Sequence, residues 1–379
     1  MAEPFRLFIV AGEPSGDRLG AELLKRLRIE TSVQPVGVGG PELEGEGLKS
    51  LFPMSNLSVM GITDVLMRLP LLYLRMQQTV QAIRGMRPDL VLLIDSQVFS
   101  ESVARRLRKA GYRGKILLYV APSVWAWKPE RAPRLRPLYD EILAVLPFEP
   151  MAMKHLGGPR TTYVGHPALQ QSQFRERQPE TGPLLLLPGS RAGELRRHLP
   201  LMREIALAAR GHPRITELVL PTVRNQLAVV SSVVSKWDLP VRVTANADEK
   251  RRAVLAAVAA VAVSGTVTLE LALAGVPMVT TYVADRGQLE AAKKYAVKFA
   301  ALPNILFGGE LVPEIIETTR QTPRVTDALM SLVDDPAAAE RQRKGFAQIR
   351  EDMERGTPSA PLQDAADRIL DYFRLLRGM

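Results

Sequence analysis

Short, continuously apolar runs alternate along this chain with longer segments in which apolar residues recur every three or four positions. The apolar runs show no polar alternation, which is typical of strands buried on both faces of a parallel sheet. The periodic segments indicate helices that cover such a sheet. The pattern therefore predicts the α/β class. It places strands at 6–12, 88–95, 114–122, 141–148, 182–190, 217–222, 258–265 and 276–283, and helices at 17–28, 70–86, 100–110, 194–210, 224–236, 248–257 and 266–275.

The pattern restarts once along the chain. Residues 167–183 are polar and contain prolines, and an apolar run that looks like another first strand follows them. We therefore expect two doubly wound, Rossmann-like domains with parallel sheets, at 1–168 and 169–354. Ligands of such sheets bind outside the carboxyl ends of the strands, so two domains facing each other would form a cleft there.

Composition narrows the classes of ligand and site. The 379 residues include no cysteine and four histidines, which excludes thiolate metal sites and disfavours a histidine-built one, so no metal and no cofactor is expected. The formal charge of +10 favours anionic partners such as phosphorylated small molecules or acidic lipid. Nucleic acid is not expected, because the basic residues are scattered and not interleaved with aromatic ones. No signal peptide and no spanning apolar run of about 20 residues is recognised, so a soluble or peripheral protein is expected.

The first strand-to-helix corner reads AGEPSGD over residues 11–17. Its glycines permit a tight turn, and Ser15 or Asp17 is suited to cap the following helix. Because the corner lies at the ligand end of the sheet, we expect these side chains to face a substrate; a capped turn without ligand is the alternative. The corner is not a dinucleotide fingerprint, because G-x-G-x-x-G is absent.

A second acid follows another strong strand. The run LLIDSQVF places Asp95 where the strand 88–95 ends. A carboxylate at this edge is suited to act as a general base or to orient one. The alternative is an N-cap for the next helix.

Two corners in the second half are suited to phosphate. LLPGSR (186–191) brings the amides of a helix start together with Ser190 and the guanidinium of Arg191, which together suit a diphosphate. SGTVTLE (264–270) places Ser264, Gly265 and Thr266 at another helix start. Glu270, in the first turns of that helix, is suited to accept hydrogen bonds from ribose hydroxyls, or merely to complement the helix N-terminus.

Two further features are ambiguous between ligand contact and packing. Trp125, in the stretch SVWAW, is suited to stack on a sugar ring or to fill a core. In the stretch 59–80, several apolar residues near arginines are left over after one helical face is assigned to the sheet. They suit an anionic bilayer or an acyl chain, with a buried helix pair as the alternative. These residues form what we call the apolar patch: Ile62, Leu66, Leu69, Leu71, Tyr73 and Leu74.

Taken together and in this order, the motifs resemble those of the lipid-A-disaccharide synthases, glycosyltransferases of family 19 with the two-domain GT-B fold. The matching stretches cover the chain from residue 11 to about 304, and the opening corner with SVWAW is the most specific combination. They are AGEPSGD, VMGI, SVWAWK, LPFE, VGHP, LLPGSR, SGTVTLE and LPN.

The resemblance implies a hexosyltransferase that joins UDP-2,3-diacylglucosamine to 2,3-diacylglucosamine 1-phosphate with inversion, releasing UDP without a metal. It implies that Asp95 is the base, that Arg191 binds the donor diphosphate and that Glu270 binds the uridine ribose. Ser15, Asp17, Trp125 and Asn304 fall in stretches that the family keeps around its site. The resemblance also implies a cytoplasmic protein that is peripheral on the inner leaflet through the apolar patch. It leaves a homodimer open. The last helix of GT-B proteins often returns to the first domain, so 355–379 is expected to do so.

The chain departs from the family pattern around the acceptor side. Val98 and Ser100 replace an acid and an asparagine after Asp95, Ala121 replaces a serine, and Pro14 stands where a smaller residue is usual. Two rival functions therefore stay open. A UDP-sugar 2-epimerase would leave the apolar patch without a purpose, and a divergent nucleotide-sugar-binding homologue would take another acceptor. The sequence does not fix acyl-chain length.

Overall fold

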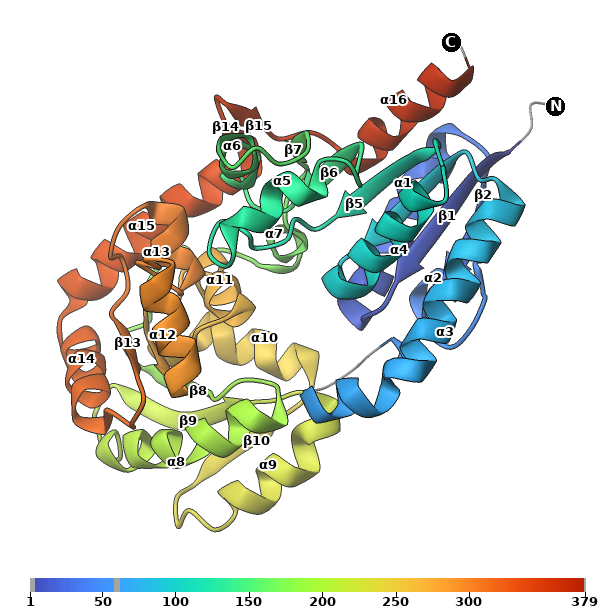
Figure 1. Ribbon diagram of the computed structural model, residues 1–379. Helices are drawn as coiled ribbons and strands as arrows, with labels where there is room; N and C mark the ends of the chain where they lie inside the picture. The colour runs from blue at the N-terminus through green and yellow to red at the C-terminus, as the bar shows by residue number, and fades with distance from the viewer. Residues whose placement is uncertain (1–3, 58–61, 378–379) are drawn as a thin grey trace. The chain divides into compact units, whose positions relative to one another are not determined.

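The computed structural model describes residues 4–57 and 62–377, and only the backbone of residues 62–67. The chain divides into two compact units: Met1–Pro167 with Arg355–Met379, and Ala168–Glu354. Each unit contains a parallel sheet with helices packed on it (Figure 1). The predicted α/β class is confirmed.

The sheet of the first unit, within the described residues, has the strand order β3-β2-β1-β4-β5-β6-β7, and all its pairs are parallel. Its two halves wind outward from β1 and β4, which is the doubly wound arrangement. The strands are β1 (Phe5–Ala11), β2 (Val33–Val38), β3 (Lys49–Ser50), β4 (Leu90–Ile94), β5 (Lys115–Tyr119), β6 (Glu141–Ala144) and β7 (Thr161–Tyr163).

Helices of the first unit pack on this sheet (Figure 1). Buried residues from α3 and α4, such as Ile83 and Leu107, form one core with Val91 and Leu93 of β4. The helices are α1 (Pro14–Glu30), α2 (Pro41–Gly45), α3 (Ile62–Met86), α4 (Gln97–Lys109), α5 (Ala132–Leu135), α6 (Glu149–His155), with short 3₁₀ turns at Met54–Asn56 and Pro129–Arg131.

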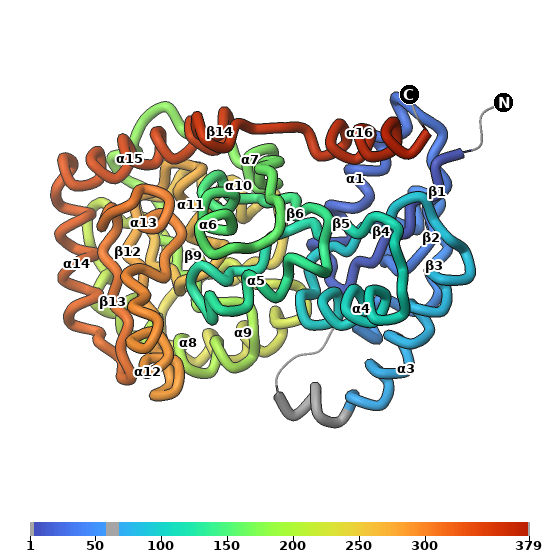
Figure 2. The backbone as a smooth tube through the Cα atoms, turned by 45° about the horizontal axis from the view of Figure 1, so that its top comes forward, coloured from blue at the N-terminus to red at the C-terminus, as the bar shows by residue number. Residues whose placement is uncertain are grey.

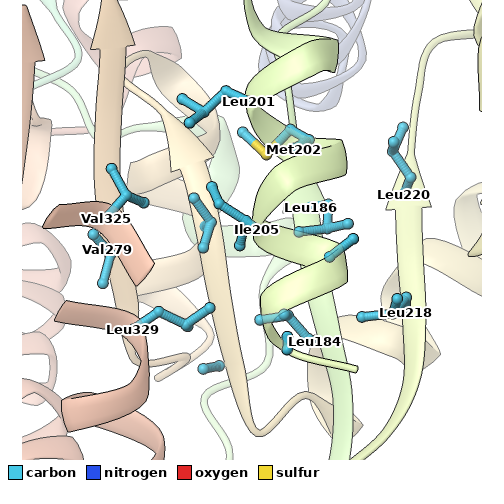
Figure 3. Close-up of a cluster of buried hydrophobic side chains, with 14 of the residues drawn as sticks. Leu184, Leu186, Leu201, Met202, Ile205, Leu218, Leu220, Val279, Val325 and Leu329 are labelled. Carbon is cyan, nitrogen blue, oxygen red and sulfur yellow. The ribbon is translucent and has the colours of Figure 1, made fainter. Parts of the chain in front are cut away.

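The second unit repeats the plan with the order β10-β9-β8-β11-β12-β13, again parallel throughout the described part. Figure 3 shows Leu201, Met202 and Ile205 of α8 facing the strands. The elements are α7 (Pro167–Gln171), β8 (Gly182–Leu187), α8 (Ala192–Ala208), β9 (Ile215–Pro221), α9 (Leu227–Val234), β10 (Val241–Thr244), α10 (Ala247–Ala256), β11 (Ala259–Val263), α11 (Thr266–Leu273), β12 (Met278–Val283), α12 (Arg286–Lys294), α13 (Leu302–Phe307), β13 (Glu314–Glu317), α14 (Thr322–Asp334) and α15 (Pro336–Arg355), with a 3₁₀ turn at Arg224–Gln226.

The predicted strands are confirmed, but the pattern missed β2, β3, β7, β10 and β13 of the two parallel sheets. These strands are short or lie toward the sheet edges, and polar residues interrupt or border their apolar runs. In β2, Gly37 has a φ of +136°, and a Cβ there would lie 1.9 Å from the carbonyl oxygen of Ile9. Only glycine fits at this contact between β2 and β1.

Helix α3 begins earlier than predicted. The pattern placed its start at Pro70, whereas the structure continues the helix back to Ile62 with Pro70 inside it. A proline removes one backbone hydrogen bond and clashes with the preceding turn. The four residues directly before it, 66–69, are good helix formers, and the helix continues through the proline.

The segment 167–183 is anchored to the second unit rather than solvated throughout. Arg175 is 6% exposed, and its Nε donates to the carbonyl oxygen of Gly275 at 2.9 Å. Its guanidinium also donates to the carbonyl oxygen of Ala257. The polar composition of the segment concealed this contact, since an arginine that satisfies buried carbonyls looks like a solvated one in the sequence.

The C-terminal segment belongs to the first unit. After α15 the chain forms the strands β14 (Gly356–Thr357) and β15 (Ala360–Pro361), and then α16 (Ala365–Arg377), which packs beside α1 (Figure 2). On α16, Arg368 pairs with the fully buried Glu141 of β6, with Nη2 2.9 Å from Oε2. A charged pair in the interior therefore ties the chain's end to the first sheet.

Candidate functional site

Three adjacent strands of the first unit bring the predicted acceptor-side motifs together. Ala11 of β1 is in register with Ile94 of β4, and Ile94 with Tyr119 of β5. The corner at 11–17, the turn at Asp95 and the loop after β5 therefore emerge side by side at the carboxyl edge. This is the edge at which doubly wound sheets bind ligands.

The backbone at this edge is strained. Asp95 and Ser96 both have left-handed dihedrals, with φ of 51° and 43°, and Val120 at the end of β5 has a φ of 76°. A β-branched residue with positive φ is a genuine outlier. Such strain costs about 1–3 kcal/mol per residue and clusters at functional sites. The close neighbour of this turn is Gly12, where a Cβ would lie 2.2 Å from Ser96 Oγ.

The carboxyl group of Asp95 lies half-buried in this turn. Burial raises its pKa above the usual value, against the opposing effect of a hydrogen bond from the amide of Ser96. A hydrogen bond stabilises the turn, because the hydroxyl of the buried Ser100 donates to the carbonyl oxygen of Asp95 at 2.7 Å. Ser100, one of the departures from the family pattern, thus supports Asp95, while Val98 is 80% exposed.

The opening corner is built differently from the prediction. Helix α1 starts at Pro14 with Glu13 as N-cap, and no side chain caps it. Proline is well suited to this first helical position, because its missing N–H would have no partner there. Ser15 is exposed in the first turn.

The prediction that Asp17 faces a substrate is corrected by the structure. Its side chain is 2% exposed, and its carboxylate accepts hydrogen bonds from the amides of Gly40, Glu42 and Leu43 at 2.7–3.2 Å. Asp17 therefore satisfies the start of α2 and holds it against α1. This leaves Ser15 as the exposed member of the predicted pair.

Trp125 takes part in packing, the alternative that the sequence left open. Its ring lies edge-on to Phe148, with centroids 4.9 Å apart, and its Nε1 donates to Glu149 Oε1 at 3.3 Å. Glu149 is buried, and burial raises its pKa to about 7, against hydrogen bonds from the amide of Leu146, from Trp125 and from the amide of Val145. The stretches SVWAW and LPFE are thus parts of one contact.

The apolar patch on α3 is exposed where it is described. Leu69, Tyr73 and Leu74 are 48%, 54% and 58% exposed, and Leu71 is half-buried. The side chains of Ile62 and Leu66 lie outside the described residues. The opposite side of the helix packs as predicted, with Met76, Thr79 and Ile83 buried. The exposed residues therefore form apolar surface beyond the face that packs on the sheet. They are not part of that packed face.

A pocket of about 350 Å³ opens at the carboxyl edge of the second sheet. It lies between the starts of α8 and α11 and the end of β9, and it gathers six residues predicted from the two phosphate-type corners. Its lining consists of Leu187, Gly189, Ser190, Arg191, Glu194, Pro221, Thr222, Val223, Lys250, Val263, Ser264, Gly265, Thr266, Val267 and Glu270.

The start of α8 already holds an anion of its own. The amides of Ser190 and Arg191 donate to Glu194 Oε2 at 3.0 and 3.2 Å, and Arg191 Nη1 lies 3.1 Å from Oε1. Burial opposes ionisation, but these hydrogen bonds hold the pKa of Glu194 below its usual value. The prediction that the Ser190 and Arg191 amides are open to phosphate is therefore corrected. The guanidinium of Arg191 remains 80% exposed at the pocket.

The start of α11 is the open one. Among the described residues, the amides of Gly265, Thr266 and Val267 donate no hydrogen bond. The buried hydroxyls of Ser264 and Thr222 have no partner within the same described part of the chain. Both line the pocket. Unsatisfied buried hydroxyls beside a helix N-terminus are what a bound anionic, hydroxylated ligand would satisfy.

Lys250 is a pocket residue that the sequence reading missed. Its Nζ lies 2.7 Å from Glu270 Oε2, and the two side chains are 37% and 40% exposed. Lys250 follows the capped start of α10, where Asn246 accepts hydrogen bonds from the amides of Asp248 and Glu249. A lysine near a helix start carries no signal of its own, because most such lysines are solvated.

Asn304 is also corrected by the structure. It is fully buried, and its amide side chain bonds the backbone of Leu311 and Val312 at 2.8–3.0 Å and Glu314 at 3.1 Å. It therefore fixes the loop between α13 and β13. Every polar atom that a ligand would use is occupied within the protein.

In the residues that the structure describes, no group of histidine, aspartate and glutamate side chains is arranged to hold a metal ion. Within the same ranges, no helix has the length and apolarity needed to cross a bilayer.

Comparison with known proteins places these features in a family context. Residues 7–365 match the family model of lipid-A-disaccharide synthetase. The chain is 42% identical to the lipid-A-disaccharide synthase of Nitrobacter winogradskyi, with 100% of this chain and 98% of that protein covered. Among solved structures it is similar to Staphylococcus aureus MnaA with UDP, with a TM-score of 0.61 at 13% identity, covering 99% of this chain and 97% of that one. It is also similar to the calicheamicin glycosyltransferase CalG4, with a TM-score of 0.59 at 18% identity, covering 98% and 99%. These two likenesses show the fold, which is GT-B.

Proposed function

The chain belongs to the lipid-A-disaccharide synthase family. From this we propose which part of the reaction takes place at the carboxyl edge of each of its two sheets. The resemblance found in the sequence is confirmed, and the protein is a hexosyltransferase of lipid A biosynthesis. It joins UDP-2,3-diacylglucosamine to 2,3-diacylglucosamine 1-phosphate and releases UDP. The rival 2-epimerase is not favoured, because the family model and the relative that match across the chain are lipid-A-disaccharide synthases.

The pocket of the second unit is the proposed site of the UDP moiety. Its open helix start and the two unpartnered hydroxyls beside it support this assignment most directly. The diphosphate would accept hydrogen bonds from the amides at Gly265 and Thr266 and meet the exposed guanidinium of Arg191. Glu270 would accept from the ribose hydroxyls. The leaving diphosphate gains charge as the glycosidic bond to UDP breaks, and these donors stabilise that charge.

On the acceptor side, we assign the base to Asp95. The carboxylate takes the proton of the acceptor hydroxyl while the oxygen attacks the anomeric carbon, which inverts that carbon. The strained, half-buried turn supports this assignment, since burial raises the pKa of the carboxyl group and so its affinity for a proton. Exposed Ser15 and the loop around Ala121 and Trp125 flank the same edge.

Incubating the enzyme with UDP-2,3-diacylglucosamine and 2,3-diacylglucosamine 1-phosphate tests the proposed reaction. Mass spectrometry should detect a disaccharide 1-phosphate that requires both substrates. A parallel incubation with UDP-N-acetylglucosamine alone, followed by NMR, should leave the sugar's configuration unchanged. Epimerised sugar, or no disaccharide at any acyl-chain length, would refute the assignment.

The apolar patch is the proposed contact with the inner leaflet. Leu69, Tyr73 and Leu74 expose their side chains next to arginines, a combination that suits an anionic bilayer. Replacing Leu69 and Leu74 by aspartate should reduce sedimentation with phosphatidylglycerol vesicles by at least about tenfold, because both burial and charge then oppose binding. Leu375→Asp with Leu376→Asp, on two exposed leucines outside the patch, is the matched control. Equal vesicle binding by both variants would remove the patch from the membrane contact.

A further inference from the structure

The pocket of the second unit contains an ion pair whose basic partner belongs to no recognised motif. Lys250 of α10 and Glu270 of α11 are 20 positions apart in the chain and meet at 2.7 Å between Nζ and Oε2. Both residues line the pocket beside the unpartnered hydroxyls of Thr222 and Ser264. The pair is therefore part of the ligand-binding surface and not a remote surface contact.

The contact leaves half of the carboxylate available. Among the described residues, the carboxylate of Glu270 accepts no hydrogen bond other than the one from Lys250. Its Oε1 is therefore open to a hydroxyl donor, while Oε2 is held by the ammonium. A carboxylate fixed at one oxygen loses less rotational freedom when the other oxygen binds a ligand.

Lys250 is itself held in place. The start of α10 is capped by Asn246, and the amide of Lys250 donates to the carbonyl oxygen of Asn246 at 3.0 Å. A flexible lysine stem normally makes a weak orienting partner, but here its origin is fixed by a capped helix turn. The backbone position from which the side chain of Lys250 reaches Glu270 is thus fixed.

We propose that Lys250 is a positioning residue, which orients the carboxylate of Glu270 to accept hydrogen bonds from the ribose hydroxyls of the nucleotide. Lys250 thereby contributes to selectivity for a ribonucleotide donor. The proposal rests on the proposed function, in which this pocket holds UDP. Lys250 acts through Glu270 and does not itself touch the nucleotide. It follows that the effect of Lys250 must vanish when Glu270 loses its charge.

The test compares binding of UDP and of 2′,3′-dideoxy-UDP by calorimetry to the full chain and to the K250M, E270Q and K250M/E270Q variants. The ratio of the affinity for UDP to the affinity for 2′,3′-dideoxy-UDP isolates the ribose contact, because a change in the pocket's net charge affects both diphosphates alike. K250M should lower this ratio by about threefold to tenfold. In the E270Q background, the same substitution should change it by less than about twofold.

A lysine of the same unit supplies the control. Lys293 pairs with Glu290 at 3.1 Å on α12, outside the UDP pocket. K293M removes an equal charge and should leave the affinity ratio unchanged, and K250R should restore part of the loss.

Four results would overturn the proposal in distinguishable ways. An unchanged ratio in K250M would show that Lys250 contributes only its charge to the pocket and does not orient Glu270. An equal loss in the wild-type and E270Q backgrounds would show that Lys250 touches the nucleotide directly. If E270Q leaves the ratio unaltered, then the proposed contact of Glu270 with the ribose is wrong. If wild-type enzyme fails to bind UDP, then the proposed nucleotide pocket is itself wrong.

Discussion

Asp95→Asn should lower turnover by about 10²–10⁴-fold, the usual contribution of a positioned general base. Asparagine has nearly the same shape as aspartate and also tolerates left-handed dihedrals. The φ of 51° at this position is therefore no obstacle to folding of the variant. What the variant lacks is the basic oxygen that receives the acceptor's proton.

The pH profile gives the base assignment a second readout. Burial raises the pKa of Asp95, so the wild-type rate should fall as pH drops through that raised value and the carboxylate becomes protonated. The residual rate of Asp95→Asn should lack this acidic limb. UDP binding, measured by calorimetry, should match the wild type, because the proposed UDP pocket is lined by residues of the second unit. Wild-type-like turnover in the variant would exclude Asp95 as the base.

Arg368→Met should destabilise the first unit by about 3 kcal/mol, because it leaves a buried charge without its main partner. Glu141 is fully buried and receives three nitrogen contacts from Arg368 within 3.3 Å. Thr162 also donates to it, and Arg160 lies 3.6 Å away, so a part of the compensation remains. Detachment of α16 from β6 is the expected structural result.

Peptide-level hydrogen exchange during denaturant unfolding measures this effect separately for each unit, which a single melting temperature does not. Arg374→Met is the matched control, since Arg374 on the same helix pairs with Glu30 and both side chains are about half exposed. Exposed pairs contribute at most about 1 kcal/mol. The double variant Glu141→Leu with Arg368→Met should recover stability, because no buried charge is left. Equal effects of the two single variants would contradict the prediction.

The predictable part of the site came from the ends of strands. Continuous apolar runs located β4, β8 and β11, and the polar residues that follow such runs in a parallel sheet lie at one edge. This placed Asp95, Arg191 and Glu270 at ligand-binding edges without any knowledge of packing. The motifs added the identity of the ligand through their resemblance to a family.

Two of the wrong predictions share one cause. Asp17 and Asn304 were predicted to face a substrate, and both satisfy backbone groups inside the protein. Short polar side chains in a motif suit a ligand and a buried loop equally well, because both offer hydrogen-bond partners. Burial alone distinguishes the two cases, and the order of residues along a loop does not encode it.

The sequence by itself determined the α/β class, the restart after the first domain and the edges where ligands bind, because these depend on local periodicity and on the direction of parallel strands. Only the tertiary structure decided which charges meet. Lys250 meets Glu270 across 20 positions, and Glu141 meets Arg368 across 227. Side-chain partners on different elements depend on how those elements pack, and the hydrophobic pattern specifies which face is buried but not which residue lies opposite.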